Sequence, residues 1–171
     1  MLTASEKDYV FQYAYLPEHI TGYVAAISEG EPFLIKDYLC YNRNGYLIFI
    51  GYPLKEPFEE IKMKETFDMA IEQIRPKQAV LIAPSIPKLQ YARSGSESDC
   101  YYRLDPSDLH IHQKLRNMIK RASRELYWEK RGNLNDDHIQ LIFEFLSAYK
   151  VSKDTQRLFE RIPKYVSSVS T

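Results

Sequence analysis

Residues 33–54 read FLIKDYLCYNRNGYLIFIGYPL, and this stretch decides the fold class. Two runs rich in Leu, Ile, Tyr and Phe flank the sequence NRNG, and such runs are typical of strands. The Asn and Gly in the middle tolerate the positive φ angles of a tight turn. The stretch therefore predicts a β-hairpin around residues 42–45.

Helical patterns lie on either side of the hairpin. Before it, Ile20, Tyr23, Val24 and Ile27 recur at the helical spacing. After it, residues 60–74 (EIKMKETFDMAIEQI) predict an amphipathic helix that ends before a proline. Its expected inner stripe consists of Ile61, Phe67, Ala70, Ile71 and Ile74.

The rest of the chain alternates short apolar runs with helical patterns. The expected strands are residues 13–15, 78–84 (which should be covered on both faces), 100–106 and 126–130. The expected helices are residues 107–125, with Ser107 or Asp108 as the cap, 135–150 and 154–168. Hairpins mixed with helical crossovers predict an α+β fold of αβα layers, with a mixed, largely antiparallel central sheet and helices on both faces.

Composition excludes several classes of protein. The 171 residues include 23 Lys+Arg and 23 Asp+Glu, so the chain as a whole has no bias toward nucleic acid or membrane. Its longest apolar runs are too short to span a bilayer, and the N-terminus has no signal-peptide pattern. We therefore expect a cytoplasmic protein without membrane insertion.

A local excess of positive charge stands out against this neutral background. Between residues 103 and 131 there are eight basic residues and four acidic ones. On the helix expected at 107–125, the spacing of the basic residues places them on one side, namely Arg116, Lys120 and Arg124 in one stripe with Lys114 and Arg121 flanking it. The opposite stripe is apolar and consists of Leu115, Met118, Ile119, Ala122 and Leu126.

Two interpretations of the basic stripe remain open. It can attract phosphate through its charge, and arginine adds bidentate hydrogen-bonding geometry. It can equally be a solvated helix face whose long side chains cover apolar neighbours. Charge runs on helices are common, so the charge pattern alone favours the solvated face.

No pattern in the sequence identifies a metal site or a catalytic residue. His110 and His112 diverge near a helix start, and no Cys, Asp or Glu completes a ligand set, so we expect no metal. Cys40 and Cys100 are too far apart for a metal or disulfide motif, and we expect small buried hydrophobes. His19 and His138 are isolated and are expected at the surface or in caps.

The segment KLRNMIKRASRELYWEK, preceded by YYRLDP, resembles a known motif. It is similar to the K-x-R-x-x-I-x-x-A segment of the Fem-type peptidoglycan aminoacyltransferases. It is also similar to the GNAT-like family that includes the C-terminal domain of phosphatidylglycerol lysyltransferase. The matching positions are Lys114, Arg116, Ile119 and Ala122, with Asn117 and Arg121 as further agreements.

This resemblance implies two GNAT-like halves in tandem. Residues 1–125 would form the N-terminal half, and residues 126–171 the strand-helix-helix start of a second half that is truncated. The CoA-binding loop of ordinary GNAT enzymes, (R/Q)-x-x-G-x-(G/A), is absent. In tandem members the second half typically holds the acyl carrier, so these residues alone are expected to be inactive.

The resemblance also implies an activity, namely transfer of an acyl or aminoacyl group to an amine or hydroxyl acceptor. The expected co-substrate is a phosphate-rich carrier, acyl-CoA or aminoacyl-tRNA, and no permanently bound cofactor is expected. Lys114, Arg116, Lys120 and Arg121 would contact its phosphates, and no residue is assigned a catalytic role.

Other functions and partners stay open beside the transferase. The alternative is a non-catalytic GNAT-like module that binds a ligand or serves as a scaffold. A third possibility, RNA binding through stacked tyrosines, is disfavoured by the zero net charge. An exposed half-domain surface could also pair two copies into a homodimer.

Overall fold

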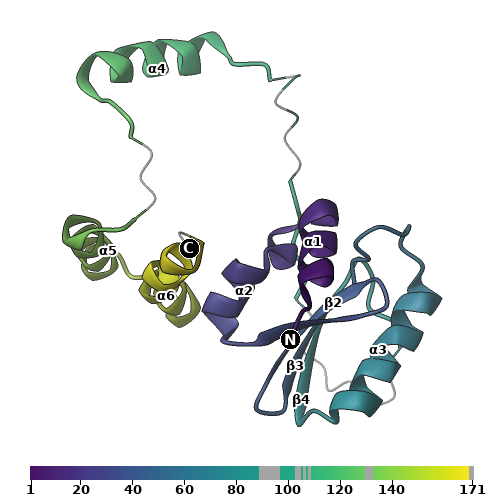
Figure 1. Cartoon of the computed structure of the whole chain (residues 1–171). Helices are drawn as coiled ribbons and strands as arrows, with labels where there is room; N and C mark the ends of the chain where they lie inside the picture. Colours follow the sequence, from purple (N-terminus) through teal and green to yellow (C-terminus); the bar gives the residue numbers. More distant parts are fainter. Residues whose placement is uncertain (89–96, 103–104, 106, 108, 130–132, 170–171) are drawn as a thin grey trace. The chain divides into compact units, whose positions relative to one another are not determined.

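The computed structural model describes residues 1–88, 97–102, 105, 107, 109–129 and 133–169 (Figure 1). The chain divides into two compact units. Unit 1 comprises Met1–Lys88 and Gly132–Thr171, and unit 2 comprises Leu89–Arg131. Two statements about domains stay predictions. These are the domain boundary between residues 125 and 126 and the truncated second half after it.

Unit 1 contains a four-stranded mixed sheet in the order β1-β2-β3-β4 (Figure 1). Strand β2 (Tyr38–Arg43) pairs antiparallel with both of its neighbours, β1 (Glu31–Ile35) and β3 (Tyr46–Ile50). Strand β4 (Gln78–Ile82) lies parallel to β3, after the crossover helix α3 (Glu60–Ile74). The predicted α+β class with a mixed sheet is therefore confirmed.

The predicted hairpin is present, with one turn more than expected. Asn44 and Gly45 have φ angles of 48° and 81°, as the tight turn between β2 and β3 requires. A second turn at Lys36 (φ 52°) and Asp37 divides the first apolar run into β1 and β2. Lys36 and Asp37, the two polar residues within that run, are the only sequence signal for this second turn.

One face of the sheet packs against the N-terminal helices α1 (Ala4–Tyr13) and α2 (Thr21–Ser28), which are joined by the short 3-10 turn Pro17–His19 (Figure 1). The core on this side consists of Leu2, Val10, Leu39, Tyr41, Ile50 and Leu54. Residues 20–27 were predicted to be helical, and α2 confirms this. The strand expected at 13–15 is wrong, because Tyr13 ends α1.

Helix α1 was missed by the periodicity, although its start has a recognisable signal. The Thr3 side chain accepts a hydrogen bond from the Glu6 backbone N–H, and the Glu6 carboxylate accepts one from the Thr3 N–H at 2.7 Å. This reciprocal pair is a capping box, which the spacing T-x-x-E at residues 3–6 indicates. Helix α1 begins at Ala4, directly after this cap.

The other face of the sheet packs against α3, whose predicted bounds are confirmed. The rings of Phe49 and Phe67 meet edge to face at 5.3 Å, and Met63 and Ala70 are fully buried beside them. Ile61 was expected on the inner stripe but is 74% exposed, because the buried stripe runs through Met63 and Thr66 instead.

Strand β4 is confirmed, but its predicted burial on both faces is wrong. It is the last strand in the sheet order, and its first three residues are exposed. An edge strand has a neighbour on one side only, which explains this exposure.

Two helices near the C-terminus, both predicted from their periodicity, are grouped with unit 1. They are α5 (Asp136–Ala148) and α6 (Lys153–Val169). Asn135 and His138 form a capping box at the start of α5, so His138 is the cap residue that was expected. Helix α6 packs against α2, where the Tyr165 and Tyr23 rings meet edge to face at 5.6 Å.

In unit 2 the described residues form one helix, α4 (Gln113–Glu125). It begins later than predicted, with His112 at the N-cap position, so Ser107 does not cap it. The Ser107 hydroxyl instead donates to Asp105 at 2.6 Å. Asp108 lies outside the described residues. The strands expected at 100–106 and 126–130 are wrong for the residues described there, which have no regular structure.

Candidate functional site

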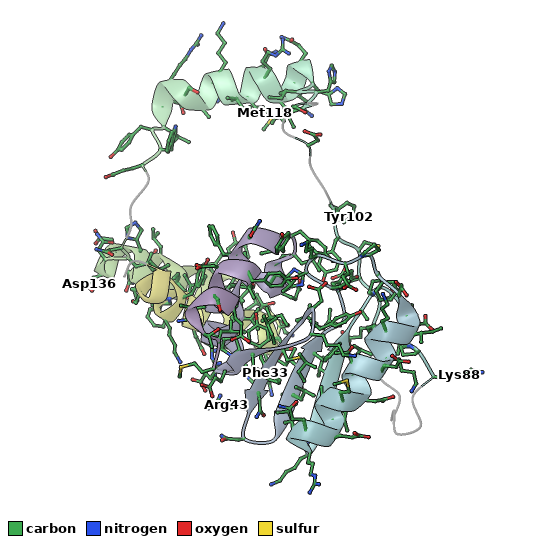
Figure 2. All side chains as sticks on the ribbon, turned by 45° about the vertical axis from the view of Figure 1, so that its right-hand side comes forward. Phe33, Arg43, Lys88, Tyr102, Met118 and Asp136 are labelled. Atoms are coloured by element: carbon green, nitrogen blue, oxygen red, sulfur yellow. The ribbon has the colours of Figure 1, made fainter. Side chains whose placement is uncertain are left out.

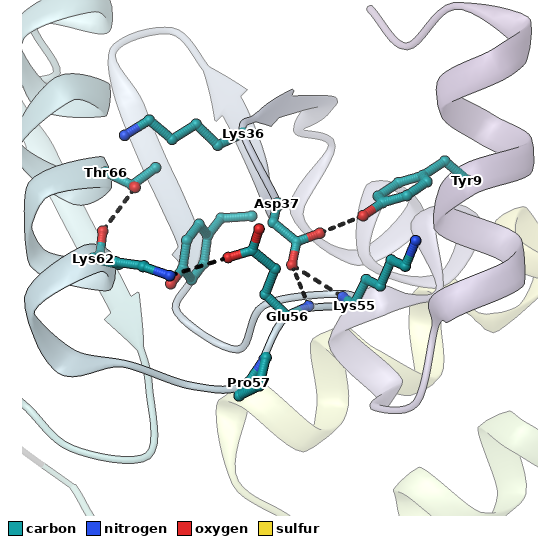
Figure 3. Close-up of a pocket in the computed structure, with 9 residues that line it drawn as sticks. Tyr9, Lys36, Asp37, Lys55, Glu56, Pro57, Lys62 and Thr66 are labelled. Carbon is teal, nitrogen blue, oxygen red and sulfur yellow. Dashed lines mark hydrogen bonds and ion pairs between the residues drawn. The ribbon is translucent and has the colours of Figure 1, made fainter.

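A pocket of about 650 Å³ lies in unit 1, at the end of the sheet that carries the β1–β2 turn (Figure 3). This volume is in the range of small-molecule sites. Four segments build it: α1, the β1–β2 turn, the loop after β3, and the start of α3. The lining residues are Tyr9, Lys36, Asp37, Tyr38, Lys55, Glu56, Pro57, Lys62 and Thr66.

Asp37 organises the pocket by joining three of these segments. Its carboxylate accepts hydrogen bonds from the Tyr9 hydroxyl at 2.6 Å and from the backbone N–H groups of Lys55 and Glu56 at 3.0 and 2.8 Å (Figure 3). Its backbone carbonyl also accepts from the Leu54 N–H at 2.9 Å. With this many donors already bound, the carboxylate acts as an anchor for the loop.

The second carboxylate of the pocket, Glu56, is paired as well. The Lys62 ammonium lies 3.5 Å from Glu56 and 2.8 Å from Glu59, at the N-terminus of α3. These partners raise the pKa of Lys62, chiefly through Glu59. Both carboxylates that line the pocket thus already have partners within the protein.

The cations that remain in the pocket are Lys36 and Lys55. No carboxylate in the described part of the chain pairs with either ammonium; that of Lys55 lies 5.3 Å from the centre of the Tyr13 ring. The pocket therefore offers two positive charges to an incoming anion. A carboxylate or a phosphate group suits such a site.

Three hydroxyl groups also line the pocket, those of Tyr9, Tyr38 and Thr66. Burial, followed by the hydrogen bond to Asp37, raises the pKa of Tyr9 to about 12. Burial also raises the pKa of Tyr38. The Thr66 hydroxyl donates to the backbone carbonyl of Lys62 at 2.8 Å (Figure 3). All three groups stay protonated near neutral pH.

The residues predicted to contact phosphate lie on α4, in unit 2. Lys114, Arg116, Lys120 and Arg121 are all exposed, and none of them forms an ion pair with another described residue. Arg116 makes a weak contact of 3.5 Å with the Ile111 carbonyl. Among the described residues this cationic side of α4 has no anionic partner, which makes it a second candidate site.

The histidines and cysteines add no metal centre. Among the described residues, no group of three His, Cys, Asp or Glu side chains could hold a metal ion. Cys40 is fully buried as expected, but the same expectation is wrong for Cys100, which is exposed.

His19 lies in the core, which corrects the expectation of a surface or cap position. It is 1% exposed, and its Nε2 lies 3.2 Å from the Tyr52 carbonyl. Burial lowers its pKa, and the neutral ring donates from Nε2 while Nδ1 faces the Tyr15 N–H at 3.5 Å. A buried neutral histidine of this kind holds the loop after β3 in place.

The comparisons with protein-family models, curated proteins and solved structures find no match to this chain. None of the helices in the described part of the chain is long and apolar enough to cross a membrane. For the pocket in unit 1 and for the cationic side of α4, the indications of function therefore come from the chemistry of their own residues.

Proposed function

We propose that the chain is the N-terminal part of a GNAT-superfamily acyl- or aminoacyltransferase that binds a phosphate-bearing carrier in the cytoplasm. The carrier is acyl-CoA or aminoacyl-tRNA, and the acceptor is an amine or a hydroxyl. The observation that carries this proposal is the cationic side of α4, whose charges have no anionic partner among the described residues.

The geometry of α4 supports phosphate binding. Arg116, Lys120 and Arg124 follow one another at four-residue spacing, which separates them by about 6 Å along the helix axis. Two of the three are arginines, which bind phosphate oxygens in a bidentate way. Such a row fits a carrier that has several phosphates better than one that has a single carboxylate.

The order of elements in unit 1 also supports the proposal. Two helices, three antiparallel strands, a crossover helix and a parallel strand follow one another in the chain. The resemblance of the motif at residues 114–122 implies two GNAT-like halves, and this order of elements agrees with the one expected for the first half. Catalysis would then consist mainly of positioning the two substrates and stabilising the developing oxyanion.

The alternative is a non-catalytic module that binds an anionic ligand, and one observation favours it. Both carboxylates that line the pocket are already bonded, Asp37 to three donors and Glu56 to Lys62. In this alternative Lys36 and Lys55 hold the ligand, and no transfer follows.

Titration of the full chain with acetyl-CoA and with aminoacyl-tRNA by calorimetry tests the proposal. Saturable binding that is lost in Arg116→Ala/Lys120→Ala but kept in Lys36→Ala/Lys55→Ala supports the carrier site on α4. The opposite pattern supports the ligand-binding module. Absence of binding to either carrier contradicts the proposed function.

A further inference from the structure

Helix α4 has two sides of opposite chemistry. Its cationic side consists of Lys114, Arg116, Lys120, Arg121 and Arg124. Its apolar side consists of Leu115, Met118, Ile119 and Ala122, and Leu126 continues it past the last turn. The helix contains one acidic residue, Glu125, at its C-terminal end, so all other charged residues of the helix are positive.

Among the described residues of unit 2, no helix or strand covers the apolar side. Leu115 and Ile119 are each 49% exposed and Met118 is 59% exposed (Figure 2, where Met118 is labelled). No other helix or strand is present among the described residues of this unit. A continuous apolar face on a charged helix normally marks a surface that binds something.

Two large aromatic side chains directly follow the helix. Tyr127 is 91% exposed and Trp128 is 87% exposed. Tyrosine and tryptophan combine an apolar ring with one polar group, and both are enriched at the interface between a membrane and water.

We propose that α4, together with Tyr127 and Trp128, lies flat on an anionic lipid surface. The apolar side enters the boundary between headgroups and acyl chains, and the flanking Lys114 and Arg121 reach lipid phosphates. At 13 residues the helix is about 20 Å long, too short to cross the hydrocarbon core but suited to lying in its plane.

The combination of charges and apolar residues selects a lipid surface over other partners. A nucleic acid offers phosphates but no apolar layer for Met118 and Ile119. A second copy of α4 offers an apolar face but brings like charges with it. An anionic bilayer offers phosphates in its headgroup layer and an apolar layer directly beneath, and these match the cationic and apolar sides of α4. Lipid binding uses the apolar side of α4 together with Lys114 and Arg121, whereas the carrier site is tested at Arg116 and Lys120, so either one can fail without the other.

The chain provides its own probe, because Trp128 is its only tryptophan. The emission of the full chain is measured with vesicles of phosphatidylcholine alone and with vesicles that also contain phosphatidylserine. We expect a blue shift with the phosphatidylserine vesicles, weakening as salt is added, and little or none with phosphatidylcholine alone.

Two matched variants locate the effect. Ile119→Glu places a charge in the apolar side of α4 and should weaken vesicle binding at least about tenfold. Ile61→Glu makes the same change at an exposed isoleucine of α3 and should leave vesicle binding unaltered. Lys114→Gln/Arg121→Gln should remove most of the preference for phosphatidylserine vesicles.

Several results would overturn the proposal. These are no blue shift with phosphatidylserine vesicles, equal vesicle binding by the two glutamate variants, or a concentration-dependent dimer that Ile119→Glu dissolves without lipid. A lowered unfolding midpoint specific to Ile119→Glu would show that the chain itself covers the apolar side, which also contradicts lipid binding. Carrier binding is measured without vesicles, so its failure is a separate result.

Discussion

The hydroxyl of Tyr9 donates a hydrogen bond of 2.6 Å to the Asp37 carboxylate. It joins the middle of α1 to the β1–β2 turn, across 28 residues of chain. The same carboxylate holds the backbone of Lys55 and Glu56, so one side chain fixes the turn, the loop after β3 and the first helix. The pocket takes its shape from this junction.

Removing the Tyr9 hydroxyl should therefore destabilise unit 1. Tyr9→Phe should lower the free energy of unfolding by about 1–2 kcal/mol, because the lost hydrogen bond is to a charged group. Urea unfolding measures the loss, with Tyr102→Phe as the control at a tyrosine that is 94% exposed. Equal stability of the two variants would show that the Tyr9 hydroxyl does not stabilise this junction.

The sequence predicts the parts of this fold that have local signals. The helix at residues 60–74 and the turn at Asn44 and Gly45 are specified by residues a few positions apart. The role of Asp37 could not be predicted, because its donors come from residues 9, 55 and 56 and meet only in the folded chain.

The α4 region shows where periodicity is sufficient and where it is not. The spacing of basic and apolar residues predicts both sides of the helix correctly. The same spacing does not show that the apolar side lacks a partner among the residues of unit 2 that the structure describes. Strand propensity was also misleading at residues 126–129, since Leu, Tyr and Trp form a strand only where another strand is available to pair with them.

Stability should fall on mild acidification because of His19. Burial holds the pKa of the folded state below the value of 6.5 for the free side chain, so the unfolded chain takes up more protons as pH falls. The contribution of His19 is therefore fully present above about pH 6.5 and is lost below it, at up to about 1.4 kcal/mol per pH unit. Urea midpoints across this range measure the loss, and His19→Gln should flatten that part of the profile.

Gly51 should not tolerate a side chain. A Cβ there would come within 2.7 Å of the Ala83 Cβ and 3.2 Å of the Ile82 carbonyl oxygen. The Gly51 N–H already donates to the same oxygen at 2.7 Å, so the two segments are held close together. Gly51→Ala should lower the free energy of unfolding by about 1–3 kcal/mol. Adding Ala83→Gly should recover part of the loss, and a Gly51→Ala protein as stable as the wild type would disprove the close approach.

The two cysteines should differ sharply in reactivity. Cys100 is exposed, whereas Cys40 is fully buried and burial raises the pKa of its thiol. A thiol reagent should modify one cysteine in the native protein and both after unfolding in urea. Cys100→Ser should abolish the native reaction, and rapid modification of Cys40 in that variant would contradict the buried position.

The salt dependence of tRNA binding tests the proposed carrier site most directly. If Arg116 and Lys120 contact phosphates, Arg116→Ala/Lys120→Ala should weaken binding and reduce the slope of log K against log salt by about two. Lys7→Ala/Lys150→Ala removes two exposed charges elsewhere in the chain and should leave that slope unchanged. Identical slopes for both pairs and the wild type, or binding of neither tRNA nor acetyl-CoA at low salt, would contradict a carrier site on α4.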